Sequence, residues 1–294
     1  MMSDNASTII FTHIPKAGGM TMRQVVARQV IGQPAFRFYH ENTFNIERFL
    51  ALPESERAAL RYVGGHVHFG IHRYIDNPCV YVTLFRDPRE QLISYYYFFQ
   101  QMPNDPDMNT LIKDKSFEEF LQMRRMQAMQ LNMIVGLDDA PDPETGKIGA
   151  RQNARLPLDE KLAIAEKHLR QHYGAIGLTG HFDESMVIMR RRMGWDNIFY
   201  LRDNTNPGRP RGQDTEHLKA LVEQYAEPDI QFFERVKAIY EEQRAEYGPD
   251  LARDLRTYQR NKAIYSRVAT LSQSLRQTGL YRRLRVIGAG GKGS

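Results

Sequence analysis

The sequence contains a single cysteine and lacks any long hydrophobic run. The one thiol, Cys79, excludes an internal disulfide and cannot build a thiolate metal cluster, which fits a reducing compartment. No stretch of about 18 consecutive apolar residues could cross a membrane, and the N-terminal residues lack the basic, apolar and small-residue order of a signal peptide. From these absences we expect a soluble, cytoplasmic protein.

The positive charge of the chain is confined to its C-terminal end. The 294 residues have a net charge of +5, and residues 251–294 alone carry ten Lys/Arg against one acid. That segment is therefore +9, which leaves −4 for residues 1–250. We expect one large domain over residues 1–250 and a basic helical extension over residues 251–294. The acidic body excludes a general nucleic-acid binder, whereas the basic extension suits an anionic polymer or a membrane surface.

Two segments show a β-rich run that leads through a turn into a helical pattern. The first is TIIFTHI at 8–14, followed by Pro-Lys-Ala-Gly-Gly and a helix over 20–31; the second is CVYVTLFR at 79–86, followed by Asp-Pro and a helix over 90–102. Further strands are expected at 61–67, 175–180 and 197–201, and further helices near 43–51, 53–60, 116–136, 158–172, 183–194 and from 214 onward. This alternation predicts an α/β fold with a parallel sheet of about five strands.

The first turn has the features of an anion site. A strand that runs through a glycine turn into a helix offers backbone N–H groups and a positive dipole end, and Lys16 adds a full charge. The phosphate loop G-x-x-x-x-G-K-[ST] is absent because the lysine precedes the glycines, which disfavours a nucleotide kinase. An ordinary tight turn at a helix start is the alternative.

The second turn predicts another anion site. Arg86 ends its strand, and Ser94 follows slightly more than two helical turns later. A guanidinium and a hydroxyl so placed suit a phosphate; the alternative is a surface ion pair of Arg86 with Asp87. Two anion sites at the carboxyl ends of strands in one parallel sheet imply a ligand with phosphates at both ends, such as a 3′,5′-bisphosphonucleotide.

Three segments carry a resemblance to a known family: HIPKAGGMT, FRDPREQLISYYYFF and GGHVHFG at 64–70. The chain resembles the sulfotransferases that use 3′-phosphoadenosine-5′-phosphosulfate (PAPS), especially the branch of heparan sulfate and uronyl 2-O-sulfotransferases. The resemblance covers roughly the first third of the chain. It implies a P-loop-like parallel sheet flanked by helices, PAPS as the donor and 3′-phosphoadenosine-5′-phosphate (PAP) as the product.

The resemblance also assigns site residues. His66 takes the role of the catalytic base, Arg86 and Ser94 bind the 3′-phosphate, and the 5′-phosphosulfate loop comprises Lys16, Ala17, Gly18, Gly19, Met20 and Thr21. The family usually has Thr or Ser where this chain has Met20, and often Arg where it has Gln91. We add Arg209 and Arg211 as residues that close over the nucleotide, with a solvated basic loop as the alternative.

Sulfuryl transfer needs a base for the acceptor proton and a cation for the leaving phosphate. His66 can supply the first, and Lys16 with the helix-start N–H groups the second. We therefore expect no metal, although His66, His68 and His72 could be read as metal ligands. A hydroxyl of a polysaccharide or small glycan is the expected acceptor. The alternative functions are a nucleotide-dependent phosphotransferase and a non-catalytic binder of sulfated or phosphorylated polymers.

Overall fold

Five parallel strands form one sheet in a computed structural model, which describes residues 7–38, 46–100, 112–138, 149–150, 153–201 and 213–277. The strand order is β2-β3-β1-β4-β5, and every neighbouring pair is parallel. The strands are β1 (Thr8–Thr12), β2 (Ala35–Phe38), β3 (Tyr62–Gly65), β4 (Cys79–Phe85) and β5 (Tyr173–Leu178). The predicted parallel sheet of about five strands is confirmed.

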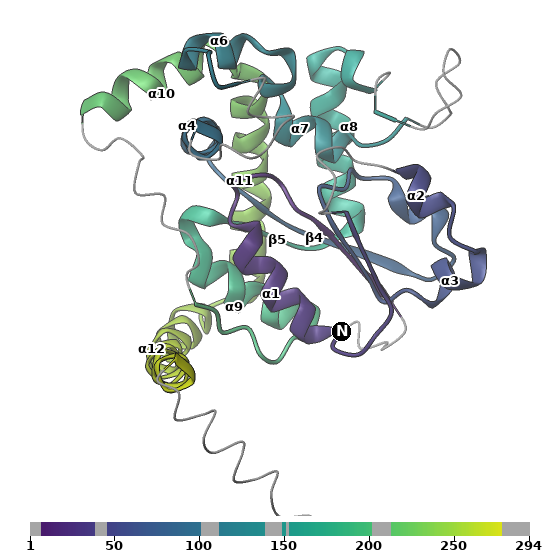
Figure 1. The fold of residues 1–294 in the computed structure, drawn as a ribbon, viewed down its shortest axis with the longest axis vertical. Coiled ribbons are helices and arrows are strands. Elements are labelled where there is room, and N and C mark those ends of the chain that lie inside the picture. The colour runs from purple at the N-terminus through teal and green to yellow at the C-terminus, as the bar shows by residue number, and fades with distance from the viewer. Residues whose placement is uncertain are drawn as a thin grey trace, which may run out of the picture.

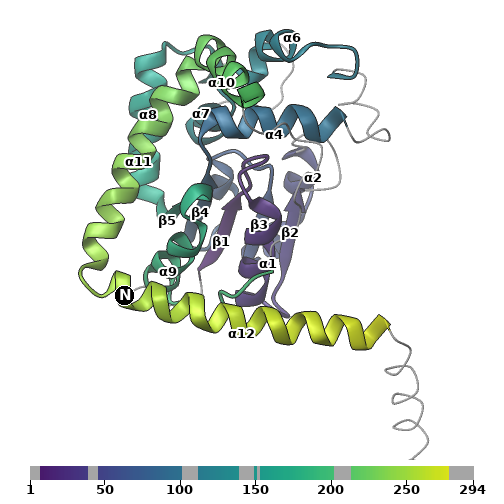
Figure 2. The same cartoon turned by 90° about the vertical axis from the view of Figure 1, so that its left-hand side faces the viewer.

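Helices cover both faces of this sheet. α1 (Gly19–Gln29) and α9 (Phe182–Met193) lie on one face, and α8 (Leu158–His172) lies on the other (Figures 1 and 2). The remaining helices are α2 (Ile46–Leu50), α3 (Glu54–Ala59), α4 (Pro88–Gln100), α6 (Phe117–Gln122), α7 (Met129–Val135), α10 (Gln213–Tyr225), α11 (Glu227–Tyr247) and α12 (Leu251–Gln277). Four short 3₁₀ turns are η1 (Ile71–Tyr74), η2 (Arg124–Met126), η3 (Asn153–Arg155) and η4 (Thr179–His181).

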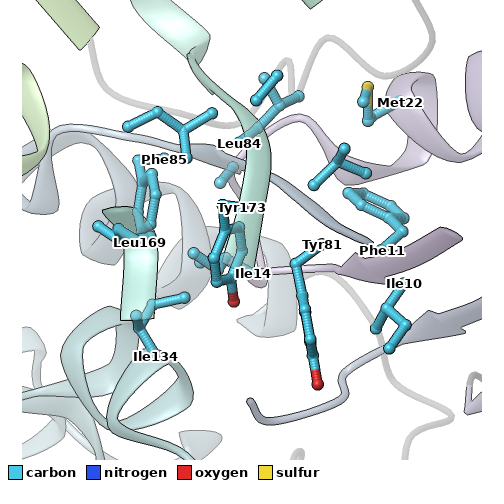
Figure 3. Close-up of a cluster of buried hydrophobic side chains, with 14 of the residues drawn as sticks. Ile10, Phe11, Ile14, Met22, Tyr81, Leu84, Phe85, Ile134, Leu169 and Tyr173 are labelled. Atoms are coloured by element: carbon cyan, nitrogen blue, oxygen red, sulfur yellow. The ribbon is translucent and has the colours of Figure 1, made fainter. Parts of the chain in front are cut away.

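The main hydrophobic core fills the space between sheet and helices. Phe11 of β1, Phe85 of β4 and Ile176 of β5 are buried almost completely. Figure 3 shows side chains from β1, β4, β5 and α8 within this core. Because helices cover both faces, the strands read as nearly continuous apolar runs, and this made β1 and β4 recognisable from sequence.

A second hydrophobic cluster holds α4. Leu92 and Ile93 of α4 pack with Phe120 of α6 and Val222 of α10, and all four side chains are at most 1% exposed. α4, which carries Ser94 of the second predicted anion site, is thereby held between α6 and α10.

Three predictions about elements differ from the structure. The strand predicted at 197–201 is wrong: Phe199 stacks on Tyr258 and Tyr265 of α12, and the carbonyl of Ile198 accepts a hydrogen bond from Tyr258. Contacts with α12 therefore help to bury these apolar residues, and none of the strands in the described ranges pairs with the segment. The single helix predicted over 116–136 is broken into α6, η2 and α7, and β2 was not predicted. The loop predicted at 138–152 lies largely outside the described residues.

The C-terminal extension is helical from Leu251 to Gln277, and its first half packs on the domain. Leu251 and Tyr258 are 8% and 5% exposed and belong to the main core. The ammonium of Lys262 lies 2.5 Å from the carboxylate of Asp183 in α9. None of the helices within the described ranges is long and apolar enough to span a bilayer.

Candidate active site

The two sequence motifs meet where the direction of the sheet reverses. After β1 the chain builds β2 and β3 on one side, whereas after β4 it builds β5 on the other. β1 and β4 are neighbours, so their carboxyl ends lie side by side at this reversal. Open α/β sheets bind ligands at such a point. The strand-loop-helix arrangement after β1 makes the fold P-loop-like, as predicted.

The loop between β1 and α1 has a backbone that few residues adopt. Lys16 has φ 60°, the one non-glycine residue with positive φ among the described ranges, and Gly18 has φ 79°. At Gly19, a Cβ atom would lie 1.7 Å from Cδ2 of His13, so only glycine fits the packed His13 ring. Such conformations persist where surrounding contacts impose them, and they concentrate at functional sites.

Arg86 connects the two motifs directly. One of its guanidinium nitrogens donates a hydrogen bond of 3.0 Å to the carbonyl of Lys16, and another lies 3.5 Å from the carboxylate of Glu90. The alternative pairing of Arg86 with Asp87 is not what the structure shows, because Asp87 pairs with Arg89 at 3.3 Å. The two predicted anion sites therefore form one continuous structure.

Lys16 is cationic but weakly solvated. Its ammonium lies 3.5 Å from the ring centroid of Phe98 in α4. Burial, together with the charge of Arg86, lowers the pKa of Lys16 to about 8. A partly desolvated cation attracts an anion more strongly than one in bulk water.

His66 has the protonation state that a base requires. Its Nδ1 lies 2.9 Å from the carbonyl of His13, which can only accept, so Nδ1 carries hydrogen and Nε2 carries the lone pair. Burial lowers the pKa of His66 below its ordinary value, so the ring is neutral at pH 7.

The histidines that were considered as metal ligands have separate surroundings. Nδ1 of His72 lies 2.9 Å from the hydroxyl of Tyr81, whereas His66 contacts His13. Burial lowers the pKa values of His68 and His72 to about 4. Within the described part of the chain, no group of three His, Cys, Asp or Glu side chains is arranged to hold a metal ion.

A buried network supports the backbone of Arg86. The Gln130 carboxamide donates to the carbonyl of Arg86 at 2.8 Å and accepts from its N–H at 3.2 Å. The carboxylate of Asp229 in turn accepts from the N–H groups of Gln130 and Leu131 at 3.1 and 2.8 Å. The end of β4 is thus fixed through α7 and α11.

The other predicted site residues differ in exposure, and two of them lie outside the described residues. Thr21 and Ser94 are buried in α1 and α4 at 6% and 7% exposure, whereas Met20 is 41% exposed. Ala17 is buried in the loop. Arg209 and Arg211 lie outside the described residues, and their assignment stays a prediction. The catalytic and binding roles of the residues that the structure does describe also remain predictions.

Sequence reasoning missed the polar residues that contact the site from distant segments. Thr179 and Gln130 contact it directly, and Asp229 acts through Gln130; the hydroxyl of Thr179 lies 2.9 Å from the carbonyl of Ala17. No local sequence motif marks them.

Part of the chain is similar to known sulfotransferases. Heparan sulfate 2-O-sulfotransferase hst-2 of Caenorhabditis elegans is 27% identical over 112 residues, 34% of this chain and 34% of that protein. Galactose-3-O-sulfotransferase 3 of Mus musculus is 24% identical over 163 residues, 51% of this chain and 35% of that protein. The alignments thus span about a third of the length of these curated relatives.

Among solved structures, mouse sulfotransferase SULT7A1 complexed with PAP aligns at 14% identity with a TM-score of 0.37, over 75% of this chain and 64% of that chain. Residues 37–133 match the sulfotransferase domain family. This matched segment carries His66, Arg86 and Ser94, and the predicted resemblance to sulfotransferases is confirmed for it.

Proposed function

We propose that this protein transfers a sulfuryl group from PAPS to a hydroxyl of a carbohydrate and releases PAP. The observation that carries the proposal is the hydrogen bond from Arg86 to the carbonyl of Lys16, which joins the two turns predicted to bind anions at the reversal point of a parallel sheet. One ligand with phosphates at both ends can contact both turns.

In the proposed reaction the acceptor oxygen forms a bond to sulfur while the bond from sulfur to the bridging phosphate oxygen breaks. The acceptor proton passes to Nε2 of His66, whose neutral ring is ready to receive it. The electron pair of the broken bond stays on the 5′-phosphate of PAP. Lys16 and the N–H groups at the start of α1 stabilise this charge.

The proposal of a carbohydrate acceptor is based on the two similar enzymes, which are named for sulfation of heparan sulfate and of galactose. A polysaccharide or a small glycan is therefore the proposed substrate class. A cytoplasmic location remains part of this proposal.

The deciding experiment is transfer of labelled sulfate from PAPS to a panel of polysaccharides, small glycans, peptides and alcohols, with and without a chelator. Transfer to a carbohydrate supports the proposal. Phosphate transfer from ATP instead would favour a phosphotransferase. Tight binding of sulfated polymers with no turnover of any donor would favour a binding protein. Loss of activity in chelator, restored by one divalent ion, would reinstate His66, His68 and His72 as ligand candidates.

We also propose that the exposed face of α12 binds an anionic polymer or membrane surface. Arg256, Arg260 and Arg267 are exposed, and no ion pair joins them to another residue in the described ranges. Ile264 and Val268, one turn apart, are 56% and 60% exposed. Arginines beside exposed apolar residues suit an anionic interface.

A further inference from the structure

Three consecutive carbonyl groups of the loop after β1 accept hydrogen bonds from side chains of three distant segments. The carboxamide of Gln91 in α4 donates to Pro15 at 2.8 Å, and the guanidinium of Arg86 donates to Lys16 at 3.0 Å. The hydroxyl of Thr179 in η4 donates to Ala17 at 2.9 Å and is also 3.0 Å from the carbonyl of Phe85. The partners come from α4, from the end of β4 and from the segment after β5.

These bonds determine where the loop N–H groups point. In a trans peptide the C=O and the following N–H point in opposite directions. The bond to Pro15 therefore fixes the N–H of Lys16, and the bond to Ala17 fixes the N–H of Gly18. Both amides are directed away from the side chains that hold the carbonyls.

The positions of Gln91 and Thr179 suit this role. Gln91 is 0% exposed, and its donated bond to Pro15 defines the orientation of the carboxamide. Thr179 lies next to the glycine that ends the loop, since a Cβ at Gly18 would be 3.6 Å from its methyl group and 3.0 Å from Phe182. Both residues contact the loop backbone and neither is part of the loop.

We propose that Gln91 and Thr179 are positioning residues that hold the N–H groups of Lys16 and Gly18 in the geometry that binds the 5′-phosphosulfate of the donor. The proposal rests on the proposed function. Both side chains act on the loop through its carbonyl groups, and neither is among the residues proposed to bind the 3′-phosphate. Their removal should therefore weaken recognition of the 5′-phosphate and leave recognition of the 3′-phosphate unchanged.

The test compares two ligands by calorimetry on the full chain: PAP and adenosine 3′-phosphate, which lacks the 5′-phosphate. The ratio of their affinities measures the contribution of the 5′-phosphate alone. Thr179→Val keeps the side-chain shape and removes the hydroxyl, and Thr179→Ser restores it. Thr8→Val is the matched control, because the Thr8 hydroxyl also donates to a backbone carbonyl, that of Leu60 at 2.8 Å, at the other end of β1.

Thr179→Val should reduce the affinity ratio by about five- to tenfold, as expected for one lost hydrogen bond that orients a binding group. Thr179→Ser and Thr8→Val should keep the wild-type ratio, although Thr8→Val should lower the melting temperature as Thr179→Val does. Gln91→Met, which cannot donate a hydrogen bond, is a second test variant in case Thr179→Val does not fold. It should reduce the affinity ratio by the same amount.

An unchanged ratio in a folded Thr179→Val or Gln91→Met would overturn the positioning role while leaving the donor site intact. A reduced ratio in Thr8→Val equal to that of Thr179→Val would also overturn it, because general destabilisation would then explain the effect. Equal affinity of the wild-type protein for PAP and adenosine 3′-phosphate is a different result: it would refute the proposed donor site itself.

Discussion

His13 holds the ring of His66 in two ways. The two rings stack with centroids 4.7 Å apart, and the carbonyl of His13 accepts a hydrogen bond of 2.9 Å from Nδ1 of His66. The stacking limits the tilt of the imidazole, and the hydrogen bond selects the tautomer with its lone pair on Nε2. One residue therefore sets both the orientation and the chemical state of the proposed base.

The first prediction concerns proton transfer. Because the pKa of His66 lies below 6.5, kcat should rise with pH over a range below that value and be level at neutral pH. His66→Ala should lower kcat by about 10²- to 10⁴-fold while PAP affinity is retained. His217→Ala, at an exposed histidine of α10, is the control. A near-normal rate for His66→Ala would mean that another residue is the base, and His68 would be tested next.

The second prediction follows from the contact between Gly19 and His13. Gly19→Ala places a methyl group where the His13 ring lies, so the ring must move and His66 loses its stacking partner. A displacement of about 1 Å at a reacting group can cost roughly a hundredfold in rate. We expect a large loss in kcat in a folded protein. Gly32→Ala is the control, because Gly32 also has a positive φ but has open space around it. This variant should lower the melting temperature and leave kcat unchanged.

The third prediction uses the lowered pKa of Lys16. The ammonium is present below about pH 8 and lost above it, so PAP affinity of the wild-type protein should fall as pH rises through about 8. Lys16→Arg keeps its charge throughout this range and should show a flatter profile from pH 7 to 9. Titration calorimetry at several pH values measures both curves, and parallel curves would contradict the assignment.

The fourth prediction concerns stability. Burial raises the pKa of Asp229 to about 7, because three backbone amides offset only part of the desolvation. The folded protein therefore binds this proton more tightly than the unfolded chain does, so the contribution of Asp229 to stability is greatest at low pH. It is lost as pH rises from about 4 to about 7.

Urea denaturation across this range should show a decline in stability that Asp229→Asn reduces. Asp254→Asn is the matched control. Hydrogen bonds from Tyr247 and Arg253 lower the pKa of Asp254, so its contribution to stability changes with pH in the opposite direction to that of Asp229. Its effect should appear only below about pH 4. Equal slopes for wild type and Asp229→Asn between pH 4 and 7 would refute the prediction.

The fifth prediction tests the proposed surface on α12. Neutralising Arg256, Arg260 and Arg267 to Gln should weaken binding to anionic vesicles or heparin-like polymers and leave PAP affinity unchanged. The effect should shrink as salt rises past roughly 0.15 M, where the Debye length is about 8 Å. A charge-matched control replaces three exposed or partly exposed arginines that already have acidic partners, namely Arg170, Arg235 and Arg244. Equal losses in both triple variants would mean that only net charge matters.

The elements that carry the two anion motifs were predictable because their signals are local. β1 and β4 are apolar runs that end at a glycine turn and at Asp87-Pro88, and α8 was predicted at its observed bounds, Leu158–His172. β2 gave no comparable signal, since its four residues include Arg37 and follow Pro34. The segment at 197–201 has the composition of a strand, but contacts with α12 decide its structure.

The supporting residues of the site could not be predicted, because their contacts join distant parts of the chain. Gln130 contacts Arg86 from 44 residues away, and Asp229 contacts Gln130 from 99 residues away. A lone buried glutamine or aspartate has many structural explanations, and the resemblance to sulfotransferases covered motifs only in the first third of the chain. The structure was needed to show that Asp229 and Gln130 form a chain of hydrogen bonds that ends at the backbone of Arg86.

Under the proposed function, the placement of α12 limits which acceptors can reach the proposed site. α12 runs along the end of the domain opposite to α4, with the strands between them (Figure 2). A molecule resting on a bilayer through α12 would therefore hold the carboxyl ends of β1 and β4 out in the surrounding solution. Headgroups of that same bilayer would lie beyond the reach of His66, whereas a glycan in solution, or one extending far from the bilayer, could approach freely. The proposed function and this geometry together favour acceptors that approach the proposed site from the aqueous side.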